Sequence, residues 1–183
     1  MNRVAETLLD LLCLPAKWAS WLILPLIVSV LVAVAGAKLG FNRLAQWGPD
    51  LPLLGRGLTM NGLLDFQWHV FALIVLFGGI LAYRHDRHVA VETVAANLPP
   101  RLRGALLVFG GLVFLVPFCL VIAWYGWSYA LTAWTTGEGS NQGGLTDRWI
   151  IKAMLPLAFG LLALAGTLRG LARLAALFRG PRA

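Results

Sequence analysis

Four blocks of apolar residues, each long enough to cross a lipid bilayer, dominate this sequence. They run over about residues 18–37, 66–83, 105–129 and 149–168. A helix rises ~1.5 Å per residue and needs roughly 20 apolar residues to cross the hydrocarbon core. Hydrophobic residues make up 59% of the chain and charged residues only 13%, which is too little charge to hydrate the surface of a soluble domain. The sequence therefore predicts an all-α membrane protein with four transmembrane helices.

The residues outside these blocks are too few for a separate soluble domain, so we expect 1–183 to form a single membrane domain. Glu6 and Asp10 precede the first block, and the block is longer than the apolar core of a signal peptide. Both features favour an uncleaved first helix. The connection over 38–65 combines turn residues with several leucines, and we expect it to lie against the membrane or a partner.

Two further segments have the periodicity of short amphipathic helices. Near residues 3–13, Val4, Leu8 and Leu11 recur at helical spacing, and the charged residues lie off this stripe. A similar pattern occurs near 88–98, before Pro99 and Pro100. We predict that both segments form helices lying in the plane of the membrane.

Positive charge is distributed unevenly along the chain, whose formal net charge is +7. The arginines gather at the ends of the apolar blocks, which favours contact with anionic lipid headgroups over binding of nucleic acid. Ten of the 15 lysines and arginines fall on the side of the termini and of the 84–104 connection. The positive-inside rule therefore predicts that both termini and this connection are cytoplasmic.

A dense group of charged residues follows the second block: Arg84, His85, Asp86, Arg87 and His88. It marks the point at which the chain leaves the membrane. Two interpretations stay open for these residues and for Glu92 on the helix behind them. His85 and Asp86 either solvate and pair at a helix end, or the segment contacts a partner.

A second group of candidate contact residues surrounds the start of the fourth block. Glu138, Gly139 and Ser140 lie in a glycine-rich connection that we expect to be a flexible polar turn, and Arg148 follows it. Lys152 is placed a few residues inside the block. It either snorkels to the membrane surface or pairs with an acid, for which the candidates are Asp65, Glu138, Asp147 and a residue of another subunit.

The apolar blocks offer little chemistry near the middle of the bilayer. Ion and anion transport needs polar ligands there, but Ser29 is the main candidate, and a lone serine usually bonds its own helix. His69 and His85 lie 16 positions apart, or roughly 24 Å along a helix, which is too far to share one haem. No sequence motif indicates a catalytic, metal or cofactor site. We expect neither an enzyme nor the transport pathway itself.

Small residues four positions apart occur in or at the end of every block. Such pairs let helices approach closely, within a chain or between subunits. The pairs are Gly36/Gly40, Gly78/Ala82, Gly126/Ala130 and Gly166/Gly170.

Several segments together resemble the small (Q-type) membrane subunit of the tripartite ATP-independent periplasmic (TRAP) transporters. They span residues 66–73, 84–92, 115–119, 137–140, 143–145 and 148–157, with the sequences FQWHVFAL, RHDRHVAVE, LVPFC, GEGS, GGL and RWIIKAMLPL. Glu92 stands where the family pattern has an aspartate. The resemblance covers the second to fourth blocks well, and the first only in position and character.

The resemblance implies a role that the residues alone do not show. It implies a large (M-type) membrane subunit that carries substrate and sodium, and a periplasmic substrate-binding protein that delivers an organic acid or similar solute. The small subunit would be a scaffold in a bacterial inner membrane. The alternative is a self-standing four-helix membrane protein, such as a redox anchor subunit or a small exporter.

Overall fold

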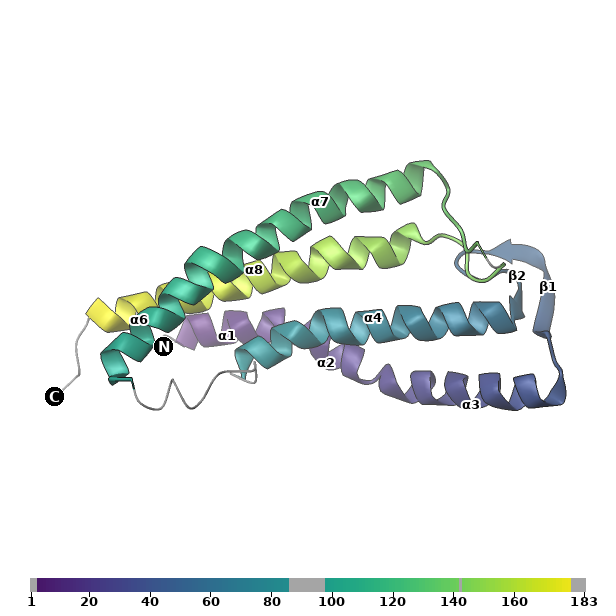
Figure 1. Cartoon of the computed structure of the whole chain (residues 1–183), viewed down its shortest axis with the longest axis horizontal. Helices are drawn as coiled ribbons and strands as arrows, with labels where there is room; N and C mark the ends of the chain where they lie inside the picture. The colour runs from purple at the N-terminus through teal and green to yellow at the C-terminus, as the bar shows by residue number, and fades with distance from the viewer. Residues whose placement is uncertain (1–2, 86–97, 142, 179–183) are drawn as a thin grey trace.

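Four long helices lie side by side in one row in a computed structural model of the chain (Figure 1). The structure describes residues 3–85, 98–141 and 143–178. The row runs in the order α3 (Ile23–Leu39), α4 (Met60–Arg84), α8 (Trp149–Phe178) and α7 (Val116–Thr135). The principal contacts of α3 and α7 are with α4 and α8 respectively, so these two helices form the edges of the row.

The four predicted transmembrane helices are confirmed, and each is longer than its apolar block. The membrane-length helical segments extend over Ala5–Leu39, Met60–Arg84, Arg101–Thr135 and Trp149–Phe178. Hydropathy marks only the part of a helix that fits the hydrocarbon core. The backbone continues as helix beyond one or both ends of each block.

The first segment is divided into α1 (Arg3–Leu12), α2 (Leu14–Ser20) and α3. Pro25 explains the second break, because it lacks the N–H that would donate to the carbonyl of Trp21. That carbonyl instead accepts from the N–H of Leu24 at 3.2 Å, in a tighter three-residue turn. Pro25 thus lies in the first turn of α3, where a proline costs little.

The helix predicted near 3–13 is present as α1, and it lies lengthwise along α8 (Figure 1). Leu8 and Leu11 of its predicted apolar stripe stay exposed, whereas Leu9 is only 1% exposed. The second predicted in-plane helix, near 88–98, falls almost entirely on residues outside those that the structure describes.

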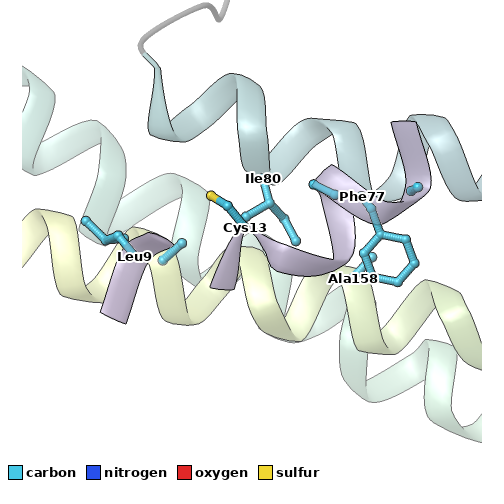
Figure 2. Packing of buried hydrophobic residues seen from close by; sticks show 8 residues of the cluster. Leu9, Cys13, Phe77, Ile80 and Ala158 are labelled. Atoms are coloured by element: carbon cyan, nitrogen blue, oxygen red, sulfur yellow. The ribbon is translucent and has the colours of Figure 1, made fainter. Parts of the chain in front are cut away.

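The core lies where α1 and α2 pack onto α4 and α8 (Figure 2). Small side chains on α2 and α8 let these helices approach closely around the larger Phe77 and Ile80 of α4. The buried members are Leu9, Cys13, Ala16, Ala19, Phe77, Ile80, Ala158 and Ala165.

Pro117 reshapes the third segment, which consists of α6 (Pro100–Phe109), the π-helix η1 (Gly110–Leu115) and α7. A proline inside a helix removes one backbone hydrogen bond and crowds the preceding turn. The wider π turn relieves this crowding, and the N–H of Val116 bonds the carbonyl of Gly111, five residues back.

Small residues bring α7 and η1 close to α8. A Cβ atom added at Gly170 would lie 2.6 Å from Cδ2 of Leu112, and one added at Gly126 would lie 3.3 Å from Cδ of Pro156. Two of the predicted small-residue pairs therefore serve packing within this chain. Gly78 of α4, by contrast, has no described atom within 4 Å of an added Cβ.

A two-stranded hairpin lies within the 38–65 connection and forms a minor sheet in the otherwise all-α chain. Strand β1 (Arg43–Leu51) pairs antiparallel with β2 (Gly55–Thr59), with two register shifts. Eight of the nine β1 residues are exposed. A strand of this kind has no buried face, so its sequence lacks the alternation of apolar and polar residues that identifies a half-buried strand. The hairpin lies where α4 and α8 begin, at the opposite end of the row from α1 and α6 (Figure 1).

Candidate functional site

Four charged side chains meet where the hairpin joins the row of helices. We call Asp65, Glu138, Arg148 and Lys152 the hairpin-end cluster. Asp65 lies in the second turn of α4 and Lys152 in the first turn of α8, while Glu138 and Arg148 lie in the connection from α7 to α8. Residues far apart in the sequence thus form two ion pairs at one end of the molecule.

Lys152 and Glu138 form one of these pairs, in which the lysine side chain is only 12% exposed. The ammonium group of Lys152 also lies 3.9 Å from the centre of the Tyr129 ring on α7, a favourable cation–π contact. A cation is disfavoured at the positive N-terminal end of a helix dipole. Glu138 and Tyr129 compensate for this, so Lys152 pairs within its own chain.

Asp65 clamps the α7–α8 connection onto α4. One carboxylate oxygen lies 3.7 Å from the guanidinium of Arg148, and the other accepts the backbone N–H of Leu145 at 3.2 Å. The Leu145 side chain is 1% exposed. Gly144 lies so close to the carboxylate that a Cβ atom there would collide with it. The described part of this connection is therefore bonded to α4 through Asp65.

The same connection binds the hairpin. Asp147 accepts the N–H of Leu53 at 3.2 Å, and the N–H of Thr146 donates to the carbonyl of Leu53 at 2.9 Å. Both Leu53 and Asp147 have positive φ, at 72° and 54°, a strained conformation that these hydrogen bonds help to hold. We call β1, β2 and the described residues of 136–148 the hairpin cap.

A hollow of about 560 Å³ lies below the hairpin cap, between α4, α7 and α8. His69 lies on its wall, and its Nδ1 contacts the carbonyl of Asp65 at 2.6 Å. The other ring nitrogen, Nε2, is buried and has no hydrogen-bond partner among the described residues. The lining consists of Asp65, Trp68, His69, Tyr129, Glu138, Asn141, Arg148, Ile151 and Lys152.

The predicted site residues Arg84 and His85 lie at the far end of α4 and do not join this cluster. Arg84 pairs with Asp10 of α1 at 3.2 Å, and His85 ends α4 with its backbone N–H on the carbonyl of Leu81. The buried Arg169 of α8 donates to the carbonyl of Tyr83 nearby. Asp86, His88 and Glu92 lie outside the described residues.

Glu138, Arg148 and Lys152 were predicted from the sequence, whereas the contributions of Asp65, His69 and Tyr129 were not. The spacing of Asp65, Trp68 and His69 at i, i+3 and i+4 is the signal that could have shown a polar face at the start of α4. The backbone N–H of Ser140 supports the connection by bonding the carbonyl of Leu145 at 3.0 Å. Nothing in the structure explains a role for Gly139.

The charged side chains of the hairpin-end cluster attach segments of the chain to one another. Within residues 3–85, 98–141 and 143–178, no three His, Cys, Asp or Glu side chains are grouped so that they could hold a metal ion. The two acids and two bases neutralise each other in pairs. These pairs join α4 and α8 to the connection between α7 and α8.

Membrane-length helices held at one end by a polar cap define a multi-pass α-helical membrane subunit. A family model described as "Tripartite ATP-independent periplasmic transporters, DctQ component" matches residues 53–179. The chain belongs to this family, so it is the small membrane component of a TRAP transporter. The matched region includes the whole hairpin-end cluster, whereas α1 to α3 and β1 precede it. A comparison with curated proteins found no match.

The substitution Glu138→Gln is expected to destabilise the protein, because it leaves the mostly buried Lys152 without a counter-ion. Breaking a fully buried pair costs about 3–5 kcal/mol, and the partial exposure of Glu138 (37%) lowers the expected loss to about 1–3 kcal/mol. The free energy of unfolding in mixed micelles measures this loss.

The matched control is Asp50→Asn, which breaks the ion pair between Asp50 and Arg56. The side chains of these two residues are 67% and 79% exposed, respectively. Exposed pairs contribute less than about 1 kcal/mol. Equal losses for the two variants would contradict the structural role of the Glu138–Lys152 pair.

Proposed function

We propose that this chain is a scaffold subunit without catalytic activity in a sodium-coupled transporter of a bacterial inner membrane. It supports a large (M-type) membrane subunit that carries the solute, an organic acid or a similar compound. A periplasmic substrate-binding protein delivers this solute. Membership of the DctQ family supports the assignment to such a complex.

The observation that carries the scaffold role is the position of the charged side chains. Helix α7 has no charged residue, and the charge in α3 is Lys38 in its last turn. In α4, no charged residue lies between Asp65 near its start and Arg84 at its end. Sodium and organic acids need polar ligands near the bilayer midplane, so the transport pathway belongs to the large subunit.

The shape of the molecule fits a supporting role. A row of helices presents more of its surface to its surroundings than a closed bundle does, and α3 and α7 carry many exposed apolar side chains. The exposed residues of α7 include an aromatic belt formed by Trp124, Tyr125, Trp127 and Tyr129. Attached to the large subunit, this row widens and anchors the part of the transporter that stays fixed while the transport domain moves.

The tagged chain is expected to retain the large subunit when both are produced together and extracted in mild detergent. Size-exclusion chromatography and quantification of the two bands measure this retention. Elution of the intact chain without the large subunit would contradict the proposed function. Lys152→Ala is expected to lower the yield of the complex because it weakens the hairpin cap, and undiminished yield would remove Lys152 from the candidate assembly residues.

The proposed orientation places the hairpin cap in the periplasm and the end containing α1 and α6 in the cytoplasm. Both natural cysteines, Cys13 and Cys119, are buried, so labelling of introduced cysteines has a low background. A membrane-impermeant maleimide should label Asn141→Cys in cells with a permeabilised outer membrane, and Arg101→Cys only after lysis. Both positions are exposed. The reverse pattern would overturn the orientation.

A further inference from the structure

We propose that the surface formed by α6 and the last turns of α8 binds the headgroups of anionic phospholipids. We call Pro100–Phe109 and residues 168–178 the α6–α8 corner. It lies at the end of the molecule opposite the hairpin cap (Figure 1). The corner needs no partner protein to form, because its two helices pack against each other.

Positive charge in this corner is not balanced by acidic residues. Arg101 and Arg103 lie in the first turn of α6, and neither α6 nor residues 168–178 of α8 contain an aspartate or glutamate. Both arginines are exposed, and neither forms an ion pair with a described residue. The corner therefore has a local positive charge, which attracts anionic headgroups.

The two arginines lie where the third membrane-length segment enters the apolar part of the bilayer. After Arg103, the chain has no charged residue before Glu138. An arginine at the end of such a segment lays its apolar stem along the hydrocarbon and extends its guanidinium group to the polar surface. The positive charge of α6 is thus placed at the depth of the lipid phosphates.

Exposed apolar side chains lie beside these charges and favour a lipid over a soluble anion. Leu102, Leu106 and Phe109 are 47%, 50% and 53% exposed. They recur at i, i+4 and i+7, so they share one face of α6. Acyl chains pack against such a face, whereas a soluble phosphate ester gains nothing from it. Guanidinium groups above an apolar face match a phosphate group above acyl chains.

The packing of α6 on α8 holds this surface in place. Gly104 lies so close to α8 that a Cβ atom added to it would be 3.1 Å from Cδ2 of Leu177. Val108, one turn further along the same side of α6, is buried. The apolar face defined above lies on a different side of the helix, so it stays accessible to lipid when α6 is packed.

Lipid binding by the purified full chain tests this proposal. Native mass spectrometry in detergent micelles measures the apparent dissociation constant for phosphatidylglycerol, with phosphatidylcholine as the zwitterionic comparison. We expect the unsubstituted chain to prefer phosphatidylglycerol several-fold. The double substitution Arg101→Gln with Arg103→Gln is expected to weaken this binding about tenfold or more, since each basic residue near an anionic surface contributes roughly fivefold.

The matched control removes the same positive charge from the hairpin. Arg43→Gln with Arg56→Gln changes two exposed residues, one on β1 and one on β2. We expect this variant to keep its affinity for phosphatidylglycerol, because these strands lie at the other end of the molecule. All four substituted side chains are on the surface, so both variants should fold, and their elution profiles check this.

Four results would overturn the proposed lipid surface. An unsubstituted chain without preference for phosphatidylglycerol has no such surface. Equal losses in the two double variants would show an effect of net charge alone. Displacement of the lipid by equimolar soluble glycerol phosphate would show an anion site that does not use the acyl chains. Weaker retention of the large subunit with unchanged phosphatidylglycerol binding would assign the two arginines to a protein contact.

Discussion

The carboxylate of Asp65 holds together the end of the molecule at which separate chain segments meet. It bonds Arg148 and the backbone of Leu145, and it thereby fixes the connection from α7 to α8 on α4. That connection in turn holds the hairpin through Asp147 and Thr146. The start of α8, the position of Glu138 and the walls of the hollow all depend on this attachment.

The rest of the molecule is stabilised by close packing of apolar surfaces. Lipid tails are as apolar as leucine, so helices in a membrane associate through contact at small residues more than through the hydrophobic effect. Gly126, Gly166 and Gly170 provide these contacts between α8 and the third segment. Small residues align the row along its length, and charged residues join its elements near both ends, through Asp65, Glu138, Arg148 and Lys152 at the hairpin end and through Arg84 and Arg169 at the other.

Much of this architecture follows from the sequence because its causes are local. The length of each apolar block predicts a membrane-spanning helix, and Pro117 lies two residues after the π turn that interrupts the third segment. The pairing of Lys152 with Glu138 was among the stated alternatives, since both residues lie near the start of the fourth block.

The hairpin and the clamp at Asp65 could not be predicted in the same way. Asp65 and Leu145 lie 80 positions apart, so their contact depends on α4 and α8 being neighbours in the row, which the hydropathy of each helix does not determine. The burial of Leu9 likewise depends on which helices pack against α1. Its neighbours Leu8 and Leu11 are as apolar, yet they remain exposed.

The central claim is that this chain supports transport without forming the pathway. Sodium-driven uptake into proteoliposomes tests it most directly, with the large subunit and the binding protein present and this chain either included or omitted. The account predicts that omission lowers the maximal rate by about tenfold or more, while the solute concentration at half-maximal rate stays the same, since the solute site lies elsewhere. Undiminished uptake without the chain would contradict the scaffold role, and an altered half-saturating concentration would place this chain in the pathway.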